Sequence, residues 1–539
     1  MREIGIPRRL FAKLTLAGLS AAALAACGGG GGGRGGPAGV LRRSTANEPQ
    51  SLDPHYVPGN AGAALMYDMF AGLMSYDAGG ALTNGLAESF DISPDGLRYT
   101  FHLRDNLKWS DGRALTSEDF VYSFRRSADP EAATRSGRVL GAVRNFRQIL
   151  RRQAPVESLG IGAPDPRTVT VELEYPASYL PDVLGSFSSA AVPRHAIEAH
   201  AERWTRPENI VVSGAFTLAE WVPNTLIRLR KNPNFYAADQ VQIEEVIFYP
   251  VERPATAVTR FRAGELDVAF NIPPDQLELL RNAGFEDAIR SSPTIGVYYA
   301  LLNNREGPTA DVRVREALSL SVDRDLICNS LMRGEGEPAY SIVPSAMPNY
   351  QGAQIAMSSQ TMDERRARAR ELLAQAGYSQ SNPLNLTYKF GGQESNRRVA
   401  VALQSMWREI GVDAVLENVG GNSIVADARN GAYQAMRYQY YAPYQDPVAF
   451  LLLMQSEANT NFSFFSDQAY DRTLDAADRT VDPELRKQRL REAEEMVMRQ
   501  FPVIPIYFNR RNYLVSSRVQ GWQENVRGEH LSRYLSLQS

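Results

Sequence analysis

The alternation of hydrophobic and polar positions is most regular between residues 86 and 124. Residues 98–103 alternate with the two-residue period of a strand that is buried on one face. The turn sequence at 93–96, Ser-Pro-Asp-Gly, precedes them and predicts a hairpin. Thr116 then offers a capping oxygen to a helix whose hydrophobic face begins at Phe120. This stretch therefore predicts strand, turn, strand and helix in that order.

Longer segments repeat a strand–helix–strand order. Residues 246–269 and 384–419 each show a hydrophobic strand, an amphipathic helix and a second strand. Such an order predicts crossover connections and parallel strand pairs, which indicates the α/β class. We also expect a helix over 66–74, a strand leaving the first half of the chain over 295–303 and a late strand over 503–508.

The first 39 residues have the pattern of an export segment. A basic start is followed by an apolar stretch over 14–26 that is too short to span a bilayer comfortably. It ends in Leu24-Ala25-Ala26-Cys27, which resembles a bacterial lipobox and predicts a signal peptide over 1–26 and lipid attachment at Cys27. Paired arginines within 7–13 also resemble a twin-arginine export motif, as an alternative to the Sec route. The glycine-rich residues up to 39 form a tether.

Composition narrows the class further. The chain has 539 residues, 44% of them hydrophobic and 22% charged, which is ordinary for a globular protein with more than one domain. A net charge of −3 without a basic tail gives no reason to expect nucleic-acid binding. The two cysteines, Cys27 and Cys328, are given to separate roles, and Cys328 is expected to be a small core residue in a helix.

Several literal strings resemble one family. They are LAES…DGLRYTFHLRDNLKWSDG within 86–112, EPQSLDPH at 48–55, VSGAF at 212–216 and NNREGPTADVRVREALSLSVDRDLI at 303–327. Together they resemble the extracytoplasmic solute-binding proteins of ABC importers, in the oligopeptide/dipeptide/nickel-binding family, and most of all its oligopeptide-binding members. The resemblance implies an α/β, bilobal, type II periplasmic-binding-protein fold, a clamshell with an extra α/β subdomain inserted in the first lobe.

The resemblance also implies how the chain divides. We expect lobe I to comprise residues 40–65, 191–295 and 505–539, with the inserted subdomain at 66–190 and lobe II at 296–504. It implies a periplasmic or cell-envelope lipoprotein, a monomer without a cofactor, that captures an oligopeptide or peptide-like solute and delivers it to a permease. ATP hydrolysis would belong to a separate ATPase subunit.

The same resemblance implies where the ligand sits. In peptide-binding members the stretch matching residues 433–450 carries the central contacts, in the cleft between the lobes. Arg437 occupies a position whose family counterpart lies near the ligand's carboxylate or in a structural salt bridge; a guanidinium can hold a carboxylate through two N–H groups. The other expected ligand-binding residues are the aromatic Tyr440, Tyr441 and Tyr444, the amides Asn303, Asn304 and Asn396, and the loop residues Pro443 and Asp446.

One of these positions departs from the family pattern. Peptide-binding members usually have an aspartate, which pairs with the ligand's ammonium group, at the position of Pro443. Proline offers neither a negative charge nor an N–H, and a buried ammonium without a partner is costly. Asp446 is retained, but in the family it more often shapes the loop. We therefore expect peptides with a free N-terminus to bind weakly, and leave open an N-blocked or cyclic ligand or a different acid.

Nothing in the sequence indicates catalysis. The strings HExxH, GxSxG and Walker A are absent, and only five histidines occur. His195 and His200 are five positions apart on an expected helix, which does not place them on one face, so no metal site is expected. The open alternatives are a binding protein for an opine, a sugar-derived compound or a modified peptide, or a clamshell sensor or chaperone without transport. An adjacent permease and ATPase gene would favour transport.

Overall fold

The structure is a computed structural model that describes residues 39–56, 62–132, 134, 140–334, 336–353, 356–379 and 381–538. All of these belong to one compact unit, Gly36–Ser539. The predicted signal peptide, Cys27 and the tether before residue 39 lie outside the described residues.

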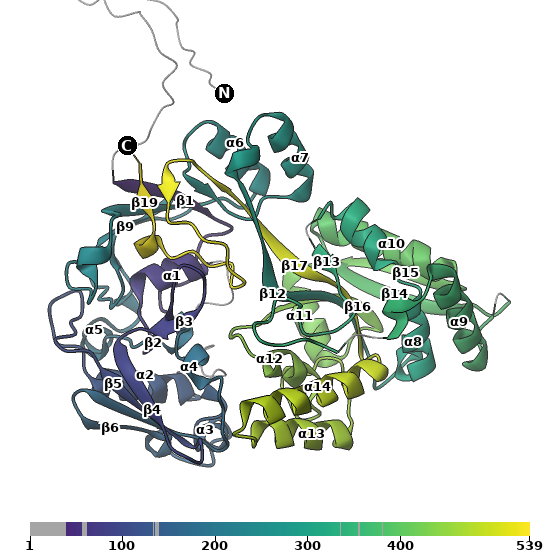
Figure 1. Ribbon diagram of the computed structural model, residues 1–539, viewed down its shortest axis with the longest axis horizontal. Coiled ribbons are helices and arrows are strands. Elements are labelled where there is room, and N and C mark those ends of the chain that lie inside the picture. The colour runs from purple at the N-terminus through teal and green to yellow at the C-terminus, as the bar shows by residue number, and fades with distance from the viewer. Residues whose placement is uncertain are drawn as a thin grey trace, which may run out of the picture. The chain divides into compact units, whose positions relative to one another are not determined.

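A large mixed sheet organises this unit (Figure 1). Within the described residues it has 11 strands, ten of them in the order β15-β14-β16-β12-β17-β11-β1-β10-β9-β8, while β13 pairs with β17 off this path. The strands are β1 Val40–Thr45, β8 Phe216–Val222, β9 Leu226–Lys231, β10 Glu245–Pro250, β11 Val268–Ala269, β12 Ile289–Leu302, β13 Gly336–Pro338, β14 Leu384–Gly391, β15 Val412–Val419, β16 Ala435–Tyr441 and β17 Val503–Val515.

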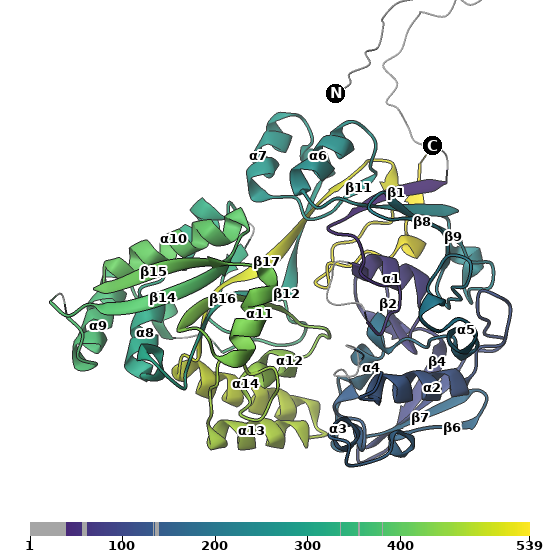
Figure 2. The ribbon, with the colours of Figure 1, turned by 180° about the vertical axis from the view of Figure 1, so that it is seen from behind.

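Two long strands, β12 and β17, join the two halves of this sheet. One end of the antiparallel pair brings Ile289 beside Leu514, next to β11 of the first lobe (β1 and β8–β11). The other end brings Leu301 beside Val503, next to β16 of the second lobe (β14–β16). Figures 1 and 2 show this pair running between the two groups of strands. The expected bilobal α/β fold is confirmed.

The predicted crossovers occur in both lobes. In the first lobe β10 and β11 both pair in parallel with β1 and are joined through α6, Pro254–Arg262. In the second, β14 and β15 are parallel and are joined through α10, Glu394–Arg408. The other helices of the two lobes are α1 Ala63–Met69, α5 Arg194–His200, α7 Pro274–Asn282, α8 Val312–Leu320, α9 Met362–Gln375, α11 Gly421–Asn430, α12 Val448–Leu451, α13 Gln468–Asp478 and α14 Pro483–Arg499.

A second, antiparallel sheet with the order β4-β5-β7-β6 forms the core of an insert, here the segment Met74–Ser189. The predicted hairpin and helix are present, and Thr116 and Asp119 form a capping box at the start of α2. The elements of the insert are β2 Met74–Tyr76, β3 Leu82–Asn84, β4 Ala87–Ile92, β5 Arg98–Leu103, α2 Ser117–Ala128, α3 Phe146–Leu150, β6 Ile161–Asp165, β7 Thr168–Glu172 and α4 Leu180–Val183.

The helix expected over 66–74 is wrong in its second half. Helix α1 ends at Met69, and the chain is already extended at Phe70. Gly72 explains the break, because a Cβ there would lie 2.4 Å from the backbone oxygen of Leu184. This close approach of two backbones requires glycine and an extended chain. Met74 then begins β2 instead of ending a helix.

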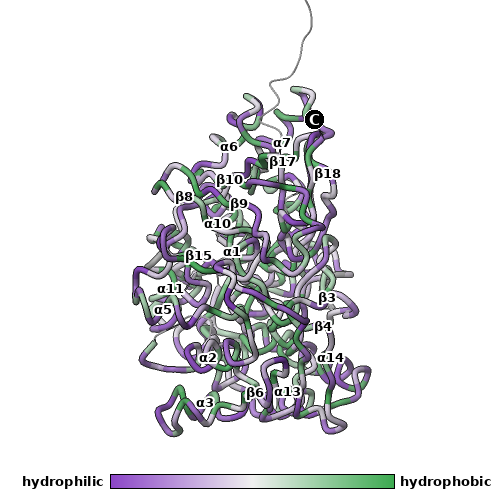
Figure 3. Tube along the Cα trace, turned by 90° about the vertical axis from the view of Figure 1, so that its left-hand side faces the viewer, coloured by the Kyte–Doolittle hydropathy of each residue, from purple (hydrophilic) through white to green (hydrophobic). Residues whose placement is uncertain are grey.

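Hydrophobic and hydrophilic residues alternate over short distances along the trace (Figure 3). No helix among the described residues is long and apolar enough to cross a membrane. Cys328 is fully buried in a π-helical turn, Leu326–Leu331, as expected for a core residue.

Candidate ligand-binding cleft

Strand β16 has one edge that is paired along its length and one that is not. It pairs with β12 from Ala435 to Tyr441, whereas β14 reaches only Ala435 and Met436. The oxygen of Gln434 accepts from the N–H of Asn303, the residue after β12, and the N–H of Ala442 donates to the oxygen of Ile295 in β12. Hydrogen-bonded positions alternate along an antiparallel pair, so the even-numbered residues from 434 to 442 direct their backbone groups to β12. Arg437 and Gln439 then direct their N–H and C=O groups to the other edge, where no strand of the described residues pairs with them beyond Met436.

The loop after β16 lies against the insert. The ring of Tyr444 stacks on that of Tyr179, with 4.9 Å between centroids and 9° between planes. The backbone N–H of Gln445 donates to Asp182, and its side chain donates to the oxygen of Gly80 over 2.9 Å. The end of β16 therefore lies where the second lobe meets the insert, which is the position expected of a ligand cleft between lobes.

Buried arginines extend this contact into the C-terminal segment. The guanidinium of Arg527 lies 3.6 Å from the ring centroid of Tyr76. It also lies 3.3 Å from a carboxylate oxygen of Asp182 and donates to the hydroxyl of Tyr67 over 3.2 Å. Asp182 thus binds Arg527 with one oxygen and the second lobe's Gln445 with the other.

A second arginine lies on the connecting strand β17. Arg511 pairs with Glu529 over 3.0 Å and lies 5.3 Å from the ring centroid of Tyr441. Burial raises the pKa of Glu529. Glu529 also lines a small pocket in the first lobe, together with Arg43, Ser44, Thr45, Gly62, Ala64, Leu65, Phe248, Val268, Phe270, Tyr513, Gly528 and His530.

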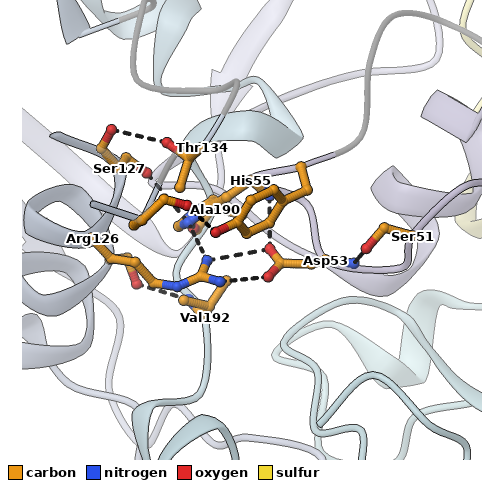
Figure 4. Close-up of polar contacts among 11 residues, drawn as sticks. Ser51, Asp53, His55, Arg126, Ser127, Thr134, Ala190 and Val192 are labelled. Atoms are coloured by element: carbon orange, nitrogen blue, oxygen red, sulfur yellow. Dashed lines mark hydrogen bonds and ion pairs between the residues drawn. The ribbon is translucent and has the colours of Figure 1, made fainter. Parts of the chain in front are cut away.

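The segment 51–56, which lies in the chain between two groups of pocket residues, 43–45 and 62–65, is held by α2 (Figure 4). Arg126 binds Asp53 over 2.6 Å and donates to Nδ1 of His55 over 2.9 Å. Nε2 of His55 lies 3.1 Å from the oxygen of Ala190, to which it donates when Nδ1 is the acceptor. Burial lowers the pKa of His55 to about 4, so the ring is neutral at pH 7. The string SLDPH is therefore a structural anchor.

The predicted residues on β16 and its loop form one stretch that ends at the contact between the second lobe and the insert. The guanidinium of Arg437 is half-buried, 5.2 Å from the ring centroid of Tyr298, and donates to Gln439. Tyr440 packs edge-on against Phe450 at 5.4 Å, and burial raises its pKa. Pro443 is exposed on the loop.

The remaining predicted residues bind protein groups. Asn303 is fully buried and donates to the oxygens of Gly431 and Tyr433, both over 3.2 Å. Asn304 donates to the backbone oxygens of Leu302, Ser463 and Pro502. Asn396 is buried on α10 beside Gly391, and Asp446 pairs with Arg486. Their assignment to the ligand stays a prediction.

Four residues of this region went unnoticed in the sequence, namely Asp182, Arg511, Arg527 and Glu529. Each belongs to a segment without a motif, and only the fold brings them together. The one available signal was a lone carboxylate in the apolar string LPDVLGSF at 180–187. Among the described residues no group of histidines, cysteines and acids is arranged to hold a metal ion. His195 pairs instead with Asp111 over 2.9 Å.

Comparison with known proteins identifies the class. The family model of bacterial extracellular solute-binding proteins, family 5, matches residues 81–462, and the chain belongs to this family. The periplasmic oligopeptide-binding protein OppA of Escherichia coli K12 is 33% identical over 519 residues, which cover 94% of this chain and 95% of that protein. The probable deoxycholate-binding periplasmic protein YgiS of the same organism is 33% identical over 489 residues, 90% of this chain and 91% of that protein.

A solved structure supports the same fold. Haemophilus influenzae OppA in complex with the peptide RPPGFSPFR superposes with a TM-score of 0.83 at 30% identity, over 94% of this chain and 100% of that one.

Proposed function

We propose that this protein is the extracytoplasmic substrate-binding component of an ABC importer for oligopeptides or peptide-like solutes. The observation that carries the proposal is the edge of β16 beyond Met436, which ends at the contact between the second lobe and the insert. An extended peptide can add to such an edge through backbone hydrogen bonds, which do not depend on its side chains. The rings of Tyr440, Tyr441 and Tyr444 would then contact the ligand's side chains.

The lobes would close around the ligand by bending at β12 and β17. In the division we propose, lobe I comprises 40–65, 191–295 and 505–539, and lobe II comprises 296–504. The inserted subdomain, 66–190, contains the insert defined above and the few residues that flank it. The two boundaries between the lobes fall inside the long strands Ile289–Leu302 and Val503–Val515. A solute held between lobes favours the closed state by differential affinity, and a permease can recognise that state.

The cellular setting is part of the same proposal. Cys27 would carry the lipid that anchors the protein to the cell envelope after export by the Sec or the twin-arginine route. The protein would act as a monomer, without a cofactor and without changing its solute chemically, beside a permease and a separate ATPase.

Native mass spectrometry of the protein as purified tests the ligand class. The mass-selected complex is dissociated in the gas phase, and any compound it releases is identified by fragmentation. Short peptides or peptide-like compounds would support the proposal. Release of a bile acid, an opine or a sugar-derived compound, with no peptide bound, would contradict it.

A further inference from the structure

The contact between the insert and the second lobe buries a carboxylate that no part of the proposed ligand site uses. Asp478, the last residue of α13, is 8% exposed. Its Oδ1 is buried and has no hydrogen-bond partner among the residues that the structure describes. An ionised carboxylate oxygen in such a place lacks both water and a donor, which disfavours the charged form.

Charged groups reach Asp478 from both sides of the contact. Burial is the largest influence and raises the pKa of Asp478 to about 7. The nearby acids Asp446 and Asp475 raise it further, while the cations Arg486 of α14 and Arg147 of the insert oppose the rise.

Two tyrosines and one arginine of the insert interact with this carboxylate. Tyr175 and Tyr179, whose hydroxyls lie 3.2 Å apart, both interact with Asp478, as does Tyr444 of the second lobe. Tyr175 also bonds to Arg147. If the second lobe moves away from the insert, Tyr175, Tyr179 and Arg147 leave together and water reaches the carboxylate.

We propose that closing of the second lobe against the insert takes up a proton at Asp478, so that acidity favours the closed form. Opening would reverse two influences on Asp478, namely burial, which raises its pKa, and the nearby Arg147, which lowers it. Since burial is the larger influence, the hydrated carboxylate of the open form has a lower pKa than that of the closed form. A group with a raised pKa in one state favours that state as the pH falls. Closing is therefore favoured below pH 7 and weakens as the pH rises through the closed-form value.

The test measures closing without any ligand, so its failure is separate from a failure of the peptide-binding proposal. Dyes are attached at Asp105→Cys in the insert and Asp363→Cys in the second lobe, whose side chains are 72% and 98% exposed. The full chain carries Cys27→Ser, and Cys328 is buried. Single-molecule energy transfer then gives the ratio of closed to open molecules at each pH.

Between pH 6 and pH 8 we expect this ratio to fall about tenfold, within the limit of tenfold per pH unit for one proton. Asp478→Asn should abolish the pH dependence. Asp475→Asn replaces an exposed acid on the same helix and should keep a pH dependence of similar size, moved to a slightly lower pH because Asp475 raises the pKa of Asp478. A change below about twofold in the parent, or an undiminished pH dependence in Asp478→Asn, would overturn the proposal. Asp478→Ser is the second uncharged variant if Asp478→Asn does not fold.

Discussion

Arg486 holds both carboxylate oxygens of Asp446, with Nη1 2.7 Å from Oδ2 and Nη2 3.0 Å from Oδ1. Both side chains are buried, and Oδ1 of Asp446 also accepts a hydrogen bond from the backbone N–H of Val448 at the start of α12. The same guanidinium lies 5.7 Å from the ring centroid of Tyr179 in the insert. Asp446 therefore fixes the loop that carries Tyr444 against the insert.

Removing the charge of Asp446 should destabilise the fold. Asp446→Asn removes the carboxylate that accepts hydrogen bonds from two nitrogens of the buried Arg486, and breaking a buried ion pair of this kind costs about 3–5 kcal/mol. Equilibrium unfolding in urea measures the loss. Glu495→Gln is the control, because its pair with Arg499 is exposed and should change the free energy of unfolding by less than about 1 kcal/mol. A similarly small change for Asp446→Asn would show that the pair does not stabilise the fold.

The network around His55 should make stability depend on pH. The pKa of His55 is lowered from about 6.5 in an unfolded chain to about 4 in the fold, chiefly by burial. The unfolded state therefore binds more protons between these values, and the free energy of unfolding should fall by up to about 3 kcal/mol as the pH drops from 7 to 4.

His55→Gln tests this assignment, because glutamine can still accept from Arg126 but does not titrate. Chemical denaturation at pH 7 and pH 4 should show a smaller pH-dependent loss than in the parent. Part of the loss should remain, since burial also lowers the pKa of His530 to about 3. An unchanged loss in His55→Gln would assign the pH dependence to other groups.

Most of the fold could be predicted because its signals are local. The cap at Thr116 forms where the sequence predicts it, as a capping box with Asp119. The end of α1 could not be predicted, because it depends on the backbone of Leu184, more than a hundred positions away. The continuous sheet through β12 and β17 likewise depends on long-range pairing that periodicity does not record.

The candidate site could be predicted only where its residues lie together in one continuous segment. Residues 437–446 lie together on β16 and its loop, so the resemblance located them as a block. Asp182 lies 345 positions before its partner Arg527, and Arg511 reaches the ring of Tyr441 from another strand, so these contacts form only after folding. Residues that meet only through long-range contacts form no recognisable motif in the sequence, so the sequence analysis could not identify them.

Gly296 and Tyr441 are cross-strand neighbours whose fit requires glycine. A Cβ at Gly296 would lie 2.4 Å from Cδ1 of Tyr441. Gly296→Ala should push the ring away from Arg511 and destabilise the fold by about 1–3 kcal/mol. In a double-mutant cycle, Tyr441→Ala should remove most of that loss. If the two losses simply add, the ring is not what requires glycine here.

Cys27 lies outside the described residues, but its proposed role is directly testable. Cys27→Ser removes the thiol that would carry the lipid, and a protein without acyl chains has no reason to remain with the membrane. We expect the variant to move from the detergent phase to the aqueous phase on phase partitioning. An unchanged distribution, with the parent in the detergent phase, would refute the lipobox.

Pro443 should weaken the binding of peptides with a free N-terminus. It is exposed on the loop beside Tyr444 and offers no charge to an ammonium group. Calorimetry should find dissociation constants weaker than about 1 μM for unmodified tri- to pentapeptides, since an unpaired buried ammonium is costly. Pro443→Asp should tighten their binding by tenfold or more, as a charge-assisted hydrogen bond is worth about 1.5–3 kcal/mol.

Two controls separate charge from loop shape. Pro443→Asn relaxes the backbone in a similar way without the charge, and should leave the affinity for unmodified peptides close to that of the parent. N-acetylated versions of the same peptides have no ammonium group, so Pro443→Asp should not improve their binding. Sub-micromolar binding of several unmodified peptides by the parent would mean that another acid accepts the ammonium group, and Glu529, which lines the pocket in the first lobe, would be the first to replace with glutamine.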